Sequence, residues 1–318
     1  MQAFSLSPED RAKLMLTLGS GTLAAATMAL RGYTFNWMSA LLPLGISVAL
    51  VAGAEIYRTT RPEPRFYLMM RETAWLLLFS PVAALLSNVL ITLNFPGMDD
   101  WLTAFDRMIG FDWGSYYAFF TGRPLVGFVA ALIYISVLPQ LAIAIIVLSM
   151  MGRGERAKEL SMAAMLGVLL AIVISTLLPA SGALAYFRPD ESLLAHRPIV
   201  DLDYKQAYFD LRAGLITHFD FYDLRGLIAF PSYHAVLSIL ISLSFRGVPK
   251  VFWPILILNI AAILTTPVEG GHDLASSIGG TLVGIASLLA AIIWRRDLNR
   301  RADRPATGAE RPSDPLVA

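Results

Sequence analysis

Two histidines have the residue type and the position for chemistry at a membrane surface. His234 lies in the segment FPSYHA (residues 230–235), and His272 ends the segment PVEGGH (residues 267–272). We expect each to stand where an apolar helix meets water, on the same side of a bilayer. Imidazole titrates near neutral pH and serves as a nucleophile or as an acid and base. A single interfacial histidine is more often structural, whereas two on one face favour phosphoryl transfer from a lipid.

The residues around the two histidines suit an anion. Pro231 fits the first turn of a helix, so the free backbone N–H groups near Tyr233 would point outward. A phosphate there gains hydrogen bonds and the positive end of the helix dipole, and Ser232 adds a hydroxyl donor. The glycine pair that ends with Gly271 lets the backbone approach a bound group closely. We therefore predict that Ser232, Tyr233 and Gly271 help to bind a phosphate.

The composition is that of a membrane protein. Of 318 residues, 56% are hydrophobic and only 15% are charged, and the mean hydropathy is +0.60. Such a chain has lipid as its natural solvent. The net charge of +1 gives no bias toward nucleic acid as a partner. The chain has no cysteine, which excludes disulfides and thiolate metal sites. The sequence contains no compact histidine–carboxylate cluster, so we expect no metal and no cofactor.

The apolar runs predict the fold class. A helix needs about 20 apolar residues to cross roughly 30 Å of hydrocarbon. Scanning with this length predicts an all-α fold, a polytopic membrane helix bundle with about eight transmembrane helices. The predicted spans are Leu14–Leu30, Trp37–Tyr57, Thr73–Asn94, Leu125–Met151, Leu160–Leu178, Pro231–Phe245, Phe252–Pro267 and Ser277–Trp294. The sixth is short, so we expect it to start below the membrane surface.

The basic residues predict which way the chain crosses. With about eight spans, both termini lie on the same side of the membrane. Most of the basic residues near the ends of the spans are expected on that side. They are Arg11, Lys13, Arg58, Arg61, Arg65, Arg71, Arg153, Arg156, Lys158, Arg246, Lys250, Arg295, Arg296, Arg300 and Arg301. The opposite connections near residues 99–112 and 268–276 are acidic. We therefore predict cytoplasmic termini in a bacterial inner membrane, with both histidines on the periplasmic face. A signal peptide is the alternative for the N-terminus, but Pro8-Glu9-Asp10 is unlike its basic start.

The two motifs resemble those of a known family, the type 2 phosphatidic acid phosphatase superfamily. Residues 230–235 look like its second motif, and residues 266–272 followed by Ile278-Gly279-Gly280 look like its third. Residues 178–182 and 211–214 look like stretches of bacterial members. Within the superfamily, the chain is most similar to the branch of inositol phosphorylceramide synthases, which are inositolphosphotransferases. The resemblance implies a six-helix phosphatase-like core.

The resemblance also implies roles for the site residues. His272 would attack phosphorus to give a phosphohistidine, and His234 would protonate the leaving alkoxide and then activate water or an acceptor alcohol. Arginines would hold the phosphate oxygens. The candidates are Arg107, Arg123, Arg212 and Arg225, of which we favour Arg212 and Arg225.

Two positions depart from the family pattern. Thr266 stands where members usually carry an arginine, and Ser276 stands where they carry an aspartate four residues after the nucleophile. That aspartate orients the imidazole across one helical turn. The carboxylates that could replace it from another direction are Asp223, Glu269 and Asp273. We place Asp273 among the catalytic residues, although neighbouring residues on a helix point about 100° apart.

With this family in mind, the chain divides into three parts. Residues 1–72 hold an N-terminal cytoplasmic segment and two additional transmembrane helices. Residues 73–294 form the phosphatase-like membrane domain. Its long connection, residues 179–230, either folds over the site or forms an ordinary interfacial cap, with a helix near residues 203–215. Residues 295–318 lose their apolar character, so we predict a disordered cytoplasmic tail with arginines at lipid headgroups.

Three functions follow from these expectations. The first is a membrane-embedded lipid phosphatase or phosphotransferase, with a lipid phosphate or diphosphate as substrate and membrane lipids as surroundings. The second is a degenerate homologue that binds lipid phosphates without turnover, because Ser276 supplies no charge. The third is an ion-coupled transporter, which the scarcity of charged residues inside the spans disfavours. The sequence leaves the oligomeric state open, and Gly280 and Gly284 predict a close helix contact within or between subunits.

Overall fold

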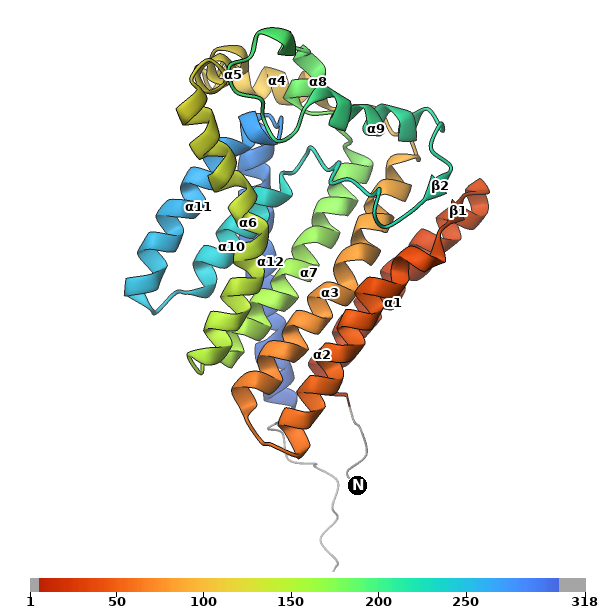
Figure 1. Cartoon of the computed structure of the whole chain (residues 1–318), viewed down its shortest axis with the longest axis vertical. Helices are drawn as coiled ribbons and strands as arrows, with labels where there is room; N and C mark the ends of the chain where they lie inside the picture. The colour runs from red at the N-terminus through yellow and green to blue at the C-terminus, as the bar shows by residue number, and fades with distance from the viewer. Residues whose placement is uncertain (1–5, 303–318) are drawn as a thin grey trace, which may run out of the picture.

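The computed structural model describes residues 6–302, and helices dominate this range (Figure 1). Within it, seven helices are long and apolar enough to cross a membrane. They are α1 (Pro8–Arg31), α2 (Leu41–Thr59, preceded by the 3-10 turn η1, Trp37–Ala40), α3 (Pro64–Ile91), α6 (Pro124–Met150), α7 (Gly154–Leu177), α11 (Pro249–Glu269) and α12 (Leu274–Ala302). α10 (Tyr233–Ser244) is apolar, but its 12 residues reach only about 18 Å. The predicted all-α membrane bundle, with a short sixth span, is confirmed.

Short elements cover one end of the bundle, which we call the cap end (Figure 1). They are α4 (Asp99–Met108), α5 (Trp113–Thr121), α8 (Ala183–Phe187), the 3-10 turn η2 (Glu191–Leu193) and α9 (Leu202–Arg212). α9 confirms the helix predicted within the long connection. α4 and α5 were missed because they are too short to span a membrane. α5 begins where the Asp112 carboxylate accepts the Ser115 N–H at 2.7 Å, a side-chain cap at its N-terminus.

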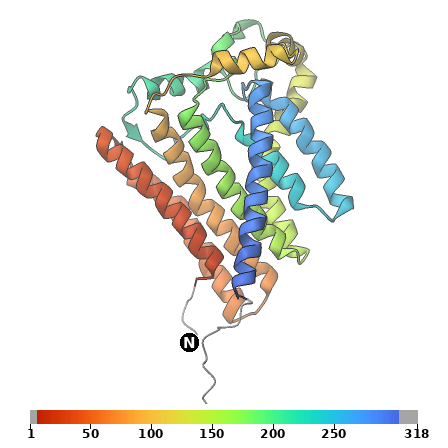
Figure 2. The same cartoon turned by 180° about the vertical axis from the view of Figure 1, so that it is seen from behind.

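The start of α1 and the end of α12 lie together at the end opposite the cap, as both views show (Figures 1 and 2). Arg295 is buried there and donates to Glu9 at 2.8 Å, and it also pairs with Glu155. The prediction of a disordered tail from residue 295 is therefore wrong for residues 295–302, which continue α12, and Arg295 is engaged by acidic side chains of the protein. The rest of the predicted tail lies outside the described residues.

The N-terminal helices pack on α3 and connect to the cap end. α1 is fixed to α3 by the buried Lys13–Glu72 pair and by Arg71, which donates to Asp10 at 2.8 and 2.6 Å. Strand β1 (Thr34–Phe35), between α1 and α2, pairs in parallel with β2 (His218–Phe219) of the long connection. Residues far apart in the sequence are thus joined beside the cap.

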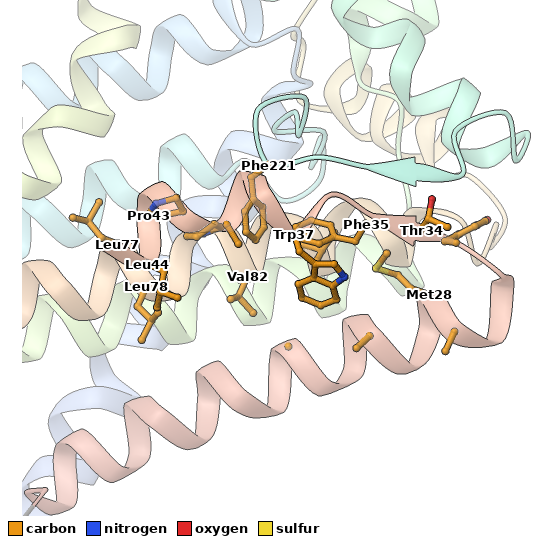
Figure 3. Close-up of a pocket in the computed structure, with 17 residues that line it drawn as sticks. Met28, Thr34, Phe35, Trp37, Pro43, Leu44, Leu77, Leu78, Val82 and Phe221 are labelled. Carbon is orange, nitrogen blue, oxygen red and sulfur yellow. The ribbon is translucent and has the colours of Figure 1, made fainter. Parts of the chain in front are cut away.

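An apolar cavity of about 580 Å³ lies between α1, α2 and α3. Figure 3 shows Leu77 and Leu78 at one end of it and Phe35 and Trp37 toward β1. Apart from Tyr33, Thr34 and the indole nitrogen of Trp37, its lining side chains carry no hydrogen-bonding or charged group, so it offers a phosphate few partners. The polar chemistry must be sought elsewhere.

Two glycines of α12 let α10 approach closely. A Cβ at Gly280 would lie 2.2 Å from the Ser232 carbonyl oxygen, and one at Gly284 would lie 2.2 Å from Ile239 Cγ2. The predicted helix contact is therefore formed within one chain. It fixes the start of α10, and with it His234, against the helix that follows His272.

Gly280→Ala is expected to lower the melting temperature of the purified protein in detergent. The added methyl group has no room against the Ser232 backbone, and such overpacking costs about 1–3 kcal/mol. Gly45→Ala is the matched control, because no atom lies within 4 Å of a Cβ there. Thermal unfolding followed by circular dichroism checks both, and equal melting temperatures would contradict the close α10–α12 contact.

Candidate active site

The two histidines line one cavity of about 320 Å³ near the cap end. His234 lies in the first turn of α10, and His272 lies in the short connection between α11 and α12. α3, α6, α7 and the long connection supply the other walls, so the long connection does fold over the site. The juxtaposition predicted from the sequence is present: both imidazoles face a single space that a bound group can occupy.

A hydrogen bond to a backbone carbonyl sets the orientation of His272. Its Nδ1 lies 2.7 Å from the carbonyl oxygen of Ala229. A carbonyl only accepts hydrogen bonds, so Nδ1 carries the proton and Nε2 keeps its lone pair. Burial, reinforced by the charge of Lys205, lowers the pKa of His272 to about 3. The ring is therefore neutral near pH 7, with Nε2 available as a nucleophile.

Nε2 lies beside Gly270 and Tyr134. A Cβ at Gly270 would lie 3.0 Å from Nε2 of His272 and 2.9 Å from the Tyr134 hydroxyl. The Tyr134 ring also stacks on the ring of His234, with 4.1 Å between centroids and 19° between planes. Tyr134 thus stacks on His234 and places its hydroxyl near Gly270, beside His272. No sequence pattern predicts this role for Tyr134, because a single tyrosine in a long apolar helix is common.

Gly270→Ala is expected to lower activity at least tenfold while the protein still folds. The new methyl group would press on Cδ2 of His272 at 2.6 Å and on Nε2, and a displacement of about 1 Å can cost a hundredfold in rate. Initial rates and the melting temperature should be measured together, with Gly45→Ala as the control. A fully active Gly270→Ala protein would show that Nε2 does not work from this position.

The family's orienting carboxylate has no side-chain replacement here. Ser276 is 0% exposed, its hydroxyl has no partner among the described residues, and its carbonyl accepts the Ser232 N–H at 2.9 Å. Asp273 forms no hydrogen bond with His272 in this range and lines a different cavity. The Ala229 carbonyl takes the orienting position instead. Sequence could not reveal it, since every residue has a carbonyl.

The other two carboxylates considered are also directed elsewhere. Glu269 accepts hydrogen bonds from His196 Nε2 at 2.9 Å and from the Ile199 N–H at 3.0 Å. It therefore joins the end of α11 to the long connection. Asp223 is exposed and does not line the histidine cavity.

Lys205 is the buried cation of this cavity, and no motif in the sequence predicts it. Its side chain comes from α9 and lines the cavity, and the residue is only 4% exposed. Nζ forms no hydrogen bond or ion pair with another side chain in residues 6–302. Burial lowers its pKa to about 8, against the opposing charges of Asp273 and Asp99. An unpaired ammonium beside a neutral nucleophile is suited to a phosphate oxygen.

Of the predicted arginines, Arg225 alone lines the histidine cavity. It lies over the Tyr204 ring at 5.2 Å and donates to the carbonyl oxygens of Asp203 and Tyr204 at 3.1 Å each. Arg212 does not reach the cavity: it donates to the Phe95 carbonyl at 2.8 Å. Its Nη1 is buried without a partner among the described residues, so the contact between Arg212 and phosphate stays a prediction that this cavity does not support.

Arg123 and Arg107 are also outside the histidine cavity. Arg123 covers the Phe119 ring at 4.3 Å, and Arg107 lines the same separate cavity as Asp273. Their positions leave Lys205 and Arg225 as the cationic side chains of the site.

The start of α10 and the residues around it differ from the predicted phosphate-binding segment. α10 starts at Tyr233 rather than at Pro231, and the Ser232 N–H is already bound to Ser276. Tyr233 lines the cavity, whereas Ser232 is completely buried outside it. Gly271 has φ +63°, and a Cβ there would lie 2.7 Å from Leu184 Cβ, so backbone conformation and packing require this glycine. Gly270 is the member of the pair that faces the cavity.

α4 fixes the segment that carries His272. The Asp106 carboxylate accepts the N–H groups of Leu274 and Ala275 at 2.8 Å each and so caps α12 from another helix. Asp99 accepts the backbone N–H groups of Ser181 and Gly182 in the same way, at 2.9 and 3.0 Å. Two acidic residues of this connection, Asp99 and Asp106, therefore hold the segments around the site together.

Comparison with known proteins gives one match. A family model described as the PAP2 superfamily matches residues 100–290, which is more than half of the chain. No curated protein and no solved structure matches this chain. The matched region runs from α4 into α12 and includes both histidines, the Ala229 carbonyl and Lys205, whereas α1 to α3 precede it. The chain therefore belongs to the PAP2 superfamily.

Proposed function

We propose that the protein is a membrane-embedded lipid phosphatase or phosphotransferase that works through a phosphohistidine. The observation that carries this proposal is the shared cavity, in which a neutral His272, His234 and the ammonium of Lys205 face one space. The substrate is a lipid phosphate or diphosphate, and the site opens on the periplasmic side of a bacterial inner membrane. The acidic connections at the cap end and the basic residues at the other end support this orientation.

The reaction proceeds in two transfers. Nε2 of His272 attacks phosphorus as the bond from phosphorus to the lipid oxygen breaks, and His234 gives a proton to that oxygen. Water or an alcohol then attacks phosphorus, His234 takes its proton, and the phosphorus–nitrogen bond breaks. Lys205 and Arg225 stabilise the charge on the phosphoryl oxygens. The Ala229 carbonyl holds the Nδ1 proton throughout and stabilises the charged phosphohistidine ring.

The likeness of the motifs to inositolphosphotransferases favours an alcohol as acceptor. In that case the product is a second phosphorylated alcohol, whereas a phosphatase releases inorganic phosphate. Both outcomes use the same first transfer, so the phosphohistidine is common to them.

The test is turnover by the purified full-length protein. Phosphatidic acid, an isoprenyl diphosphate and a phosphoinositide are supplied with and without an alcohol acceptor, and released phosphate and new phosphorylated products are measured. We expect turnover of at least one lipid, with a phosphoenzyme that is stable in alkali and labile in acid.

A second function, lipid phosphate binding without turnover, is favoured by one observation. Ser276 is buried without a partner where a carboxylate is expected, so the phosphohistidine lacks a fixed negative charge nearby. Saturable binding of lipid phosphates with no phosphoenzyme and no product from any of them would select this function instead.

A further inference from the structure

A second cavity of about 430 Å³ lies on the other side of the His272 segment. α4, α5 and the chain after α8 form its walls together with Asp273. It shares no lining residue with the histidine cavity. The proposed reaction at Nε2 of His272 uses the histidine cavity and assigns no role to this second space.

Three buried polar atoms in the lining of this cavity have no partner. They are Oδ2 of Asp273, the hydroxyl of Tyr117 and Oγ1 of Thr103, whose residues are 1%, 3% and 5% exposed. Buried polar groups are almost always hydrogen-bonded, and leaving one without a partner costs free energy. Three such atoms around one space indicate a ligand that supplies their hydrogen bonds.

The charges around the cavity select the kind of ligand. Asp106, Asp112 and Asp273 line it against the single cation Arg107. Burial raises the pKa of Asp273 to about 7, and the neighbouring charges of Asp106 and Asp99 add to this effect. A phosphate would be repelled here, whereas a cation would relieve the buried carboxylate.

The number and type of the unpaired atoms indicate which kind of cation fits this cavity. An ammonium group has three N–H donors, and the three unpaired oxygens are all able to accept a hydrogen bond. Within residues 6–302, no group of three or more histidine, cysteine or acidic side chains is arranged to hold a metal ion. Aromatic rings of Phe111, Trp113 and Phe187 complete the walls and suit a short organic chain.

We propose that this cavity binds a small primary ammonium, whose three N–H groups donate to Asp273, Tyr117 and Thr103. The amine is either free in solution or the headgroup of an aminophospholipid. Its binding does not depend on turnover in the histidine cavity, so the inference can be tested even in an inactive protein.

The first experiment titrates the purified full-length protein in detergent with ethanolamine and follows the heat of binding. We expect saturable binding of ethanolamine. Glycerol, which has hydroxyls without charge, and tetramethylammonium, which has charge without N–H donors, should bind at least tenfold more weakly. Absence of saturable ethanolamine binding, or equal binding of glycerol, would overturn the proposal.

Variants identify the site. Asp273→Asn keeps the shape of the side chain and should weaken ethanolamine binding at least tenfold, and Tyr117→Phe and Thr103→Val should weaken it severalfold. The matched control is Asp203→Asn, an exposed acid of α9 that does not line the cavity. Tyr117→Phe and Thr103→Val each remove an unpaired buried hydroxyl, so their melting temperatures without ligand should equal or exceed that of the original protein. Unchanged ethanolamine binding in Asp273→Asn would exclude this cavity as the site.

Nanodiscs distinguish the two sources of the amine. If the headgroup of an aminophospholipid is the ligand, free ethanolamine should bind more weakly in phosphatidylethanolamine nanodiscs than in phosphatidylcholine nanodiscs, because the lipid competes. If the free amine is the ligand, the two affinities should agree. Either result supports an ammonium site, provided that Asp273→Asn removes the binding.

Discussion

His272→Asn is expected to abolish the phosphoenzyme and to reduce lipid phosphate turnover by roughly a thousandfold or more. Asparagine places an amide nitrogen close to the position of Nδ1, so the hydrogen bond to the Ala229 carbonyl can persist. What it removes is Nε2, the atom that forms the bond to phosphorus in the proposed reaction. The variant therefore separates the nucleophile from the packing of its segment.

The measurement traps the protein with radiolabelled lipid phosphate and compares the phosphoenzyme with the steady-state rate. His218→Asn is the matched control, because His218 is exposed in β2, where its Nδ1 lies 2.8 Å from Thr34 Oγ1, away from the cavity. Phosphoenzyme formation in His272→Asn at the original level would remove His272 as the nucleophile. A loss that also occurs in His218→Asn would point to a general folding defect.

Lys205→Met is expected to lower kcat/KM by about 10²–10³, the usual effect of removing one donor that stabilises transition-state charge. Methionine fills the space of the lysine stem and removes only the charge and the donors. Because the pKa of Lys205 is lowered to about 8, the ammonium is lost as pH rises through that value. The kcat/KM of the original protein should therefore fall above about pH 8, and that of Lys205→Met should not fall there.

Stability separates this effect from misfolding. The folded-state pKa of Lys205 lies below the ordinary lysine value of 10.5, so burial of the ammonium destabilises the folded protein in full below about pH 8. This destabilisation disappears as pH rises from about 8 to about 10.5. In that range the folded protein has already lost the Lys205 proton, whereas the unfolded chain still binds it. Lys205→Met should be at least as stable as the original protein near pH 7. Lys250→Met, at an exposed lysine of α11, is the control. An unaltered kcat/KM in Lys205→Met would exclude Lys205 from phosphate binding.

The membrane helices could be predicted because a long apolar run has few alternatives in lipid. Two helix ends could not be predicted: the start of α3 at Pro64 and the extension of α12 to Ala302. Both lie in polar sequence, which forms helix here through tertiary contacts such as that of Arg295 with Glu9. α4 and α5 are too short to be seen in a scan for spans. Hydropathy thus predicted the bundle and missed most of its cap.

The histidine pair could be predicted because both residues stand at apolar boundaries beside recognisable motifs. The groups that complete the cavity could not. Lys205 lies in a segment of mixed aromatic and charged residues, where arginines are the more usual phosphate ligands. Tyr134 is a single aromatic residue in an apolar helix. Ala229 acts through its backbone, which no residue type reveals. Arg212 was predicted from its charge and motif alone, but its guanidinium is bound to the Phe95 carbonyl instead.

The parallel pairing of β1 with β2 has a mechanical consequence. Two backbone segments, Thr34–Phe35 and His218–Phe219, tie the hairpin of α1 and α2 to the stretch of chain that also carries Lys205. Any outward movement of that stretch must either move the hairpin with it or break the pairing of β1 with β2. The first two helices, which precede the family match, are therefore expected to restrain any movement of the chain that covers the histidine cavity.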